Sequence, residues 1–119
     1  MSFRITEEYV QAALELEHAG YCWQPGPGDW LLDRDDHSVG MLTTRPVDAP
    51  RIRRLNTHLP THAQVDEMLA QAGVVQHGTR FVDRAGREVA AFAESAVLAD
   101  PALCRLKALA AWFRAGATK

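Results

Sequence analysis

Three stretches of the chain repeat apolar residues at helical spacing, and each has a start and a stop signal. They are predicted as helices over about Glu7–Ala19, His62–Ala72 and Pro101–Ala115. Each begins beside a side chain that can accept a hydrogen bond from a free backbone N–H, and each ends at a glycine that can close the helix. The caps are Thr6, Thr61 with Gln64 as a capping box, and Asp100 before Pro101; the glycines are Gly20, Gly73 and Gly116.

Two pairs of short segments between these helices are predicted as β-hairpins. Trp30–Asp33 and Val39–Thr44 flank a polar loop, and Arg80–Asp83 and Glu88–Ala93 flank a turn in which Gly86 can take a positive φ. The element order is then α-β-β-α-β-β-α. It predicts an α+β fold with an antiparallel sheet of about four strands and three helices. The third helix is the most apolar, so we expect it to pack against the sheet.

A length of 119 residues fits a single domain with its own core. The segment Arg45–Pro60 contains prolines at positions 46, 50 and 60, which break regular structure. It is predicted as a long exposed connection, and connections of that length are often functional or mobile.

Charge and cysteine content indicate which partners and which cellular location to expect. A net charge of −2 and a pI near 6.2 predict no strong general attraction to nucleic acid or anionic membranes. No signal-peptide pattern opens the chain and the apolar run at 108–113 is too short to span a bilayer, so a cytoplasmic location is expected. Cys22 and Cys104 are isolated from each other in sequence and are predicted to be free thiols, at least one of them buried.

A segment rich in glycine, proline and tryptophan follows the first helix. Trp23, Pro25 and Gly28-Asp29-Trp30 form a W-x-P-x-x-GDW pattern, and Pro60-Thr61 with Val65 and Met68-Leu69 form a helix start of the type P-[ST]-x-x-x-[ILV]-x-x-[LM]-[IL]. With the Ala- and Leu-rich helix at 102–115, these patterns resemble a group of small bacterial and phage-associated proteins that have no assigned function. The resemblance implies a similar α+β fold and no particular activity.

The same GDW segment is the first candidate site. Tyr21, Trp23, Asp29 and Trp30 could line a pocket for a small planar or peptide ligand, because aromatic faces bind such groups well. The alternative is a rigid structural corner, in which Gly28 allows a sharp turn, Asp29 caps it and Trp30 points into the core.

The second candidate site is basic. Arg45, Arg51, Arg53 and Arg54 cluster with only Asp48 nearby in sequence, and guanidinium groups can hold phosphate with two parallel hydrogen bonds. No aromatic residues are interleaved with them for base stacking. The alternative is a solvated loop whose arginines pair with carboxylates.

Metal and catalytic motifs are not found. His58 and His62 are four residues apart, but Pro60 and the cap at Thr61 fall between them and break helical chelation geometry. Asp33, Asp35 and Asp36 lack the spacing of a calcium loop. No nucleophile elbow, phosphate-binding loop or dinucleotide fingerprint is present. We therefore expect no metal and no cofactor. The absence of these motifs favours a non-enzymatic protein but leaves the question of an enzyme open.

The leading hypothesis is a non-enzymatic protein-interaction module. It would present aromatic and apolar surface from the sheet or the third helix to another protein or to a second copy of itself as a homodimer. The alternatives are a nucleic-acid-associated accessory protein that uses Arg45–Arg54, and a small-ligand or enzymatic site around the GDW segment. No membrane partner is expected.

Overall fold

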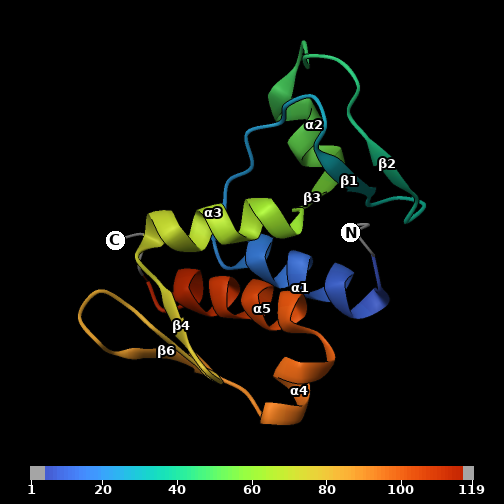
Figure 1. Cartoon of the computed structure of the whole chain (residues 1–119). Coiled ribbons are helices and arrows are strands. Elements are labelled where there is room, and N and C mark those ends of the chain that lie inside the picture. Colours follow the sequence, from blue (N-terminus) through green and yellow to red (C-terminus); the bar gives the residue numbers. More distant parts are fainter. Residues whose placement is uncertain (1–4, 117–119) are drawn as a thin grey trace.

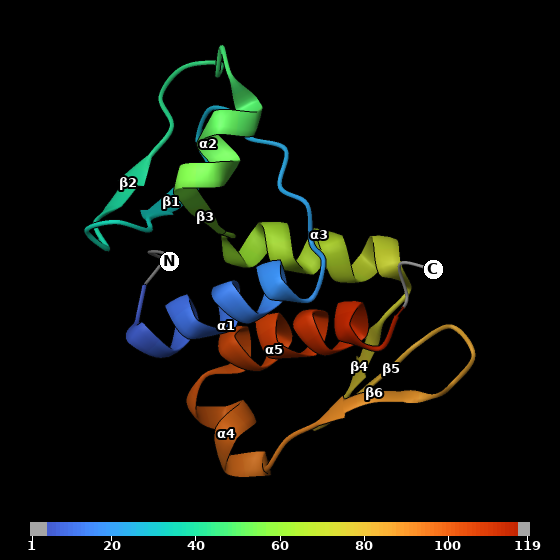
Figure 2. The same cartoon turned by 180° about the vertical axis from the view of Figure 1, so that it is seen from behind.

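The computed structural model describes residues 5–116 and shows an α+β fold with a central group of helices between two small sheets (Figures 1 and 2). The helices are α1 (Glu7–His18), α2 (Ala49–Leu55), α3 (His62–Ala72), α4 (Glu94–Ala99) and α5 (Pro101–Arg114). The strands are β1 (Trp30–Asp33), β2 (Val39–Met41), β3 (Asn56–Leu59), β4 (Val75–His77), β5 (Arg80–Val82) and β6 (Glu88–Ala91).

Each sheet has three antiparallel strands. The first has the order β2-β1-β3, and β1 pairs Leu31 with His58 and Leu32 with Thr57. Because neighbours across a ladder share a face, Leu32 and Thr57 point to one face of this sheet and Leu31 and His58 to the other. The second sheet has the order β4-β5-β6 and lies at the opposite side of the helices (Figure 1).

The core lies between the helices, with α5 at its centre. This helix contacts α1, α3, α4 and β6, and both Leu106 and Leu109 are fully buried. Burying a leucine side chain contributes roughly 1.5–3 kcal/mol, so α5 is the main apolar support of the fold. Cys104 is buried in the same helix and Cys22 is exposed, and both are free thiols as predicted.

The predicted helix caps are confirmed. The Thr6 hydroxyl accepts from the Tyr9 N–H at 3.1 Å, and the Asp100 carboxylate accepts from the Leu103 N–H at 3.0 Å. Thr61 and Gln64 form the full capping box, and Gly73 closes α3 with a φ of 77°. Gly86 has the positive φ expected in the β5–β6 turn.

Other parts of the predicted fold are wrong. In residues 5–116, six strands form two sheets instead of about four in one, and β3, β4, α2 and α4 were not expected. The segment Arg45–Pro60 is not a long exposed connection, since it folds into α2 and β3, and residues 57–60 are buried. β2 ends at Met41, before the predicted Thr44, and β6 ends at Ala91, before Ala93.

The apolar third helix packs against a sheet as predicted, but its main neighbours are helices. It packs mainly among other helices, with one contact to a sheet through β6, and seven of its residues are buried. Its apolar character is therefore largely explained by the core. Among the described helices, none combines the length and the hydropathy that a membrane crossing requires.

Candidate functional site

The connection between α1 and β1 passes α3 and rises to the first sheet (Figure 2). Its aromatic side chains Tyr21 and Trp23 contact His58. Trp23 is buried and its ring stacks on the His58 imidazole with centroids 5.0 Å apart and planes 6° from parallel. The Tyr21 ring stacks on the same imidazole at 5.9 Å and meets Phe113 edge to face at 5.9 Å. His58 on β3 is therefore the point around which this connection is organised.

Asp29 fixes the turn that follows these aromatics. Its Oδ2 accepts from the Trp23 indole Nε1–H at 2.9 Å and from the Gly26 backbone N–H at 3.0 Å, and its Oδ1 accepts from Gln64 Nε2 at 2.7 Å. Hydrogen bonds to a carboxylate are stronger than those between neutral groups. Asp29 thus ties the connection to α3 as well as to itself.

The hydrogen bonds of Gln64 determine the state of His58. Because Gln64 Nε2 donates to Asp29, its Oε1 must be the acceptor for the Thr61 N–H at 2.8 Å and for His58 Nε2 at 3.2 Å. We therefore assign the Nε2–H tautomer to His58, which leaves Nδ1 to accept from the Tyr21 hydroxyl at 3.0 Å. The network runs from Tyr21 through His58 and Gln64 to Asp29, with every donor matched to an acceptor.

Burial dominates the electrostatics of this network. Desolvation lowers the pKa of His58, against the opposing effects of Asp29 and of the hydrogen bond to Gln64. Burial likewise raises the pKa of Tyr21 to about 12, with Asp29 adding to the effect. Both side chains are neutral near pH 7, as the hydrogen-bond assignment requires.

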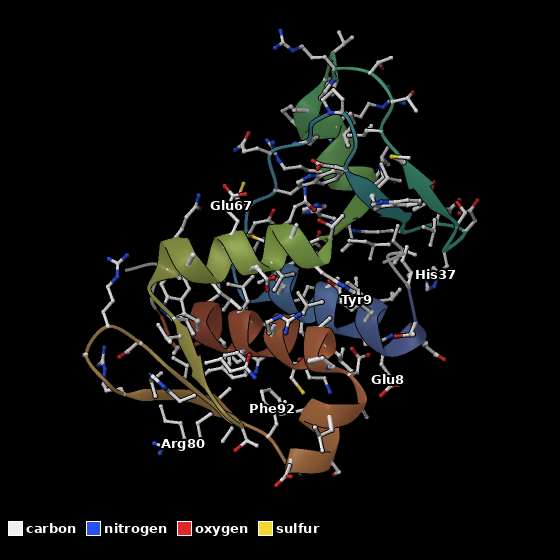
Figure 3. The ribbon with its side chains drawn as sticks, in the orientation of Figure 1. Glu8, Tyr9, His37, Glu67, Arg80 and Phe92 are labelled. Carbon is white, nitrogen blue, oxygen red and sulfur yellow. The ribbon has the colours of Figure 1, made fainter. Side chains whose placement is uncertain are left out.

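A groove runs between this connection and α3. Its widest part has a volume of about 540 Å³ and is bounded by residues of 21–29 on one side and by Gln64, Glu67, Met68 and Gln71 of α3 on the other. An adjoining part of about 430 Å³ shares Met68 and Gln71 and reaches Trp112 and Phe113 at the end of α5. We call these two parts together the α3 groove; Glu67 projects from α3 beside it (Figure 3).

A second hollow lies on the other side of the same connection. It has a volume of about 280 Å³, and its lining comprises Tyr21, Cys22, Trp23, His58, Ala13, Glu17, Arg34 and Arg53. We call it the Arg53 groove. Arg34 is paired with Glu17 across it, and Arg53 Nη1 donates to the Trp23 carbonyl at 3.3 Å.

The backbone between the two grooves has few hydrogen bonds. Side-chain burial alternates from Tyr21 to Gln24, which indicates an extended conformation. The Tyr21 N–H donates to the Leu16 carbonyl, and the Trp23 carbonyl accepts from Arg53. The backbone groups of Cys22 and Gln24, two residues that line the α3 groove, have no hydrogen-bond partner among residues 5–116.

The predicted ligand-binding residues are only partly brought together. Tyr21, Trp23 and Asp29 surround His58 as one cluster. Trp30 is separate, because its strand position pairs it with Leu59 and it packs against the core on the opposite face of the sheet. The sequence did not predict His58 and Gln64 as members of this cluster. It had indicated Gln64 only as part of a capping box and His58 only as a possible metal ligand.

The predicted arginine cluster is also divided. Arg51, Arg53 and Arg54 lie on α2, and Arg45 lies in the loop before it. Only Arg53 is half-buried and lines a groove; the other three are exposed. Within residues 5–116, no three His, Cys, Asp or Glu side chains are grouped so that they could hold a metal ion.

No protein-family model, no curated protein and no solved structure matches this chain. The resemblance drawn from the GDW pattern therefore stays a prediction, and the site has to be interpreted from its own geometry.

Proposed function

We propose that the protein is a protein-interaction module that binds an extended peptide segment of its partner in the α3 groove. The observation that carries this proposal is the open backbone edge at Cys22 and Gln24, which borders that groove. An exposed extended segment with unpaired N–H and C=O groups can pair with an added strand, and main-chain hydrogen bonds then supply affinity.

The composition of the groove supports the same binding mode. Tyr21, Met68, Trp112 and Phe113 supply apolar and aromatic surface, while Gln64 and Gln71 supply amide groups. Aromatic and methionine side chains are enriched at binding surfaces, since they offer large contact area and, for methionine, an adaptable shape. Side chains that alternate along a bound strand would enter the groove at every second position.

The hydrogen-bond network supports the proposal through preorganisation. Asp29, Gln64 and His58 hold the connection in one geometry before any partner arrives. A surface that is already ordered loses less conformational entropy on binding, which improves affinity. The network is thus a scaffold for the groove.

Selection from a displayed library of linear peptides tests this function. Enriched peptides are then measured against the wild type, Cys22→Pro and Cys22→Ala. Proline deletes the N–H at the open edge and its ring obstructs pairing there, whereas alanine removes the thiol alone. We expect Cys22→Ala to bind like the wild type and Cys22→Pro to lose about tenfold, which corresponds to about one hydrogen bond of 1.4 kcal/mol.

Two results would count against the proposal. One is a library from which no linear peptide is enriched. The other is a set of peptides that bind Cys22→Pro as tightly as Cys22→Ala. Sedimentation of the protein alone then identifies the source of the peptide segment, because a monomer at high concentration indicates a different protein and a dimer indicates a second copy of this chain.

A further inference from the structure

The arginines among residues 5–116 fall into two classes. Arg34, Arg80, Arg87, Arg105 and Arg114 each form an ion pair with an aspartate or a glutamate. Arg84 and the arginines at positions 45, 51, 53 and 54 form none with any carboxylate of the described part of the chain, and Arg84 instead donates to the Gln71 carbonyl. Four of these five arginines lie on α2 or in the loop before it, although the whole protein has a net charge of −2.

Arg53 is the member of this group that faces a binding space. It lies half-buried at the Arg53 groove, where Glu17 is already paired with Arg34 and desolvation keeps His58 neutral. One N–H of its guanidinium donates to the Trp23 carbonyl. A guanidinium has five N–H donors, so four remain for another acceptor.

We infer that the Arg53 groove is a carboxylate subsite and that the partner segment bound in the α3 groove carries an aspartate or glutamate side chain that pairs with Arg53. This inference rests on the proposed function, because both grooves border Tyr21–Trp23 and share these residues in their lining. Only the connection at Tyr21–Trp23 separates a partner bound in the α3 groove from Arg53.

Size and charge both fit a carboxylate. A volume of about 280 Å³ holds an acidic side chain with a few waters, since one water occupies roughly 30 Å³ of liquid. Carboxylate is the group that a guanidinium fork binds with two parallel hydrogen bonds. Arg51 and Arg54 are one helical turn apart on the same helix, and they add positive potential within a Debye length of about 8–10 Å.

The charge beside the α3 groove favours one orientation of the bound partner segment. Glu67 stands exposed beside it and receives a hydrogen bond only from Gln71, at 3.4 Å, among the described residues. A negative charge there disfavours an acidic side chain at that end and favours a neutral or basic one. The acidic residue of the partner therefore belongs at the Arg53 end.

A small-molecule titration tests the subsite without any peptide. N-acetyl-aspartic acid amide is added to the protein, and the NMR signals of the Arg53 Nε–H and the Trp23 indole N–H are followed. We expect both signals to shift with this probe, to stay in place with N-acetyl-asparagine amide, and to be insensitive to the acid in Arg53→Gln. Glutamine removes the positive charge and keeps an amide donor on a shorter side chain.

The peptides selected on the α3 groove provide the second arm. An acidic residue should recur at one position, and changing it to its amide should weaken binding about tenfold to hundredfold, as should Arg53→Gln. Arg114→Gln is the matched control, because Arg114 is paired with Glu15 and lines neither groove. It should leave the affinity unchanged.

The outcomes separate the two proposals. Selected peptides that show no acidic preference and bind Arg53→Gln normally overturn the carboxylate subsite and leave the proposed function intact. A shift with the aspartate probe, but no enriched peptide, supports the subsite and contradicts the proposed function. Single-stranded DNA that binds more tightly than any acidic peptide, with a strong dependence on salt and on Arg51 and Arg54, overturns the inference in favour of a nucleic-acid partner.

Discussion

Replacing Asp29 by asparagine tests the hydrogen-bond network at its most connected residue. The asparagine oxygen can keep the two donors that now reach Oδ2, from Trp23 and Gly26. Its amide nitrogen then takes the place of Oδ1 and faces Gln64 Nε2, which is also a donor. Turning the Gln64 amide over removes that conflict, but it presents an NH₂ group to the Thr61 N–H and breaks the capping box of α3.

Either arrangement lowers the free energy of unfolding. A part-buried donor left without an acceptor costs about 1–3 kcal/mol, and loss of an N-terminal cap costs about 1 kcal/mol. Loss of the negative charge also weakens the two bonds that remain. We expect the free energy of unfolding to fall by about 3 kcal/mol, which at about 4 °C per kcal/mol corresponds to a melting temperature about 12 °C lower.

Urea denaturation followed by tryptophan fluorescence measures this change, with Asp35→Asn as the matched control. Asp35 is exposed, and its carboxylate forms no hydrogen bond or ion pair with the described residues, so its replacement should alter stability by less than about 0.5 kcal/mol. If Asp29→Asn were as stable as Asp35→Asn, the network would not hold the connection in place, and the preorganisation argument would fail.

Two further predictions concern the same elements. Folding lowers the pKa of His58 below its unfolded value of about 6.5, so between the two pKa values the unfolded chain binds one proton more than the folded chain. The contribution of His58 to the free energy of unfolding should therefore be complete above this pH window and should fall as the pH drops through it. NMR of the imidazole should show His58 titrating below about 6.5. A His58 titration at or above 6.5 would contradict the assigned burial. Gly73→Ala should lower the free energy of unfolding by about 1–2 kcal/mol, because a Cβ at a φ of 77° is strained and would meet the Arg84 side chain. Gly40→Ala is the control, since its Cβ would make only ordinary contact with Leu31. In thermal unfolding it should cost less than Gly73→Ala. Equal costs at the two glycines would refute the argument from backbone conformation.

The elements that sequence predicted well depend on neighbours in the chain. A cap such as Thr61 with Gln64 requires only residues three apart, so the pattern of letters contains the whole interaction. The α2 helix has the same kind of start, with Asp48 capping and a proline in the first turn. That signal was present in the sequence, but the prolines and arginines around it favoured a loop interpretation.

The β3 strand could not be recognised in this way. Its letters Asn-Thr-His-Leu are polar enough to read as a loop, yet Thr57 and His58 are buried. Thr57 is satisfied by Arg34 and His58 by Tyr21 and Gln64, so the partners come from distant parts of the chain. A single sequence does not specify those pairings. For the same reason, Tyr21, Trp23 and Asp29 could be predicted as candidates, but His58, which joins them, could not.

The most direct test of the central claim is amide hydrogen exchange at Cys22 and Gln24 with and without a selected peptide. If the peptide pairs with the open edge beside the α3 groove, the exchange of both amides should slow markedly on binding, while exposed amides of the β5–β6 turn stay unchanged. A peptide that binds tightly and leaves both amides exchanging as fast as in the free protein would contradict strand pairing at this edge.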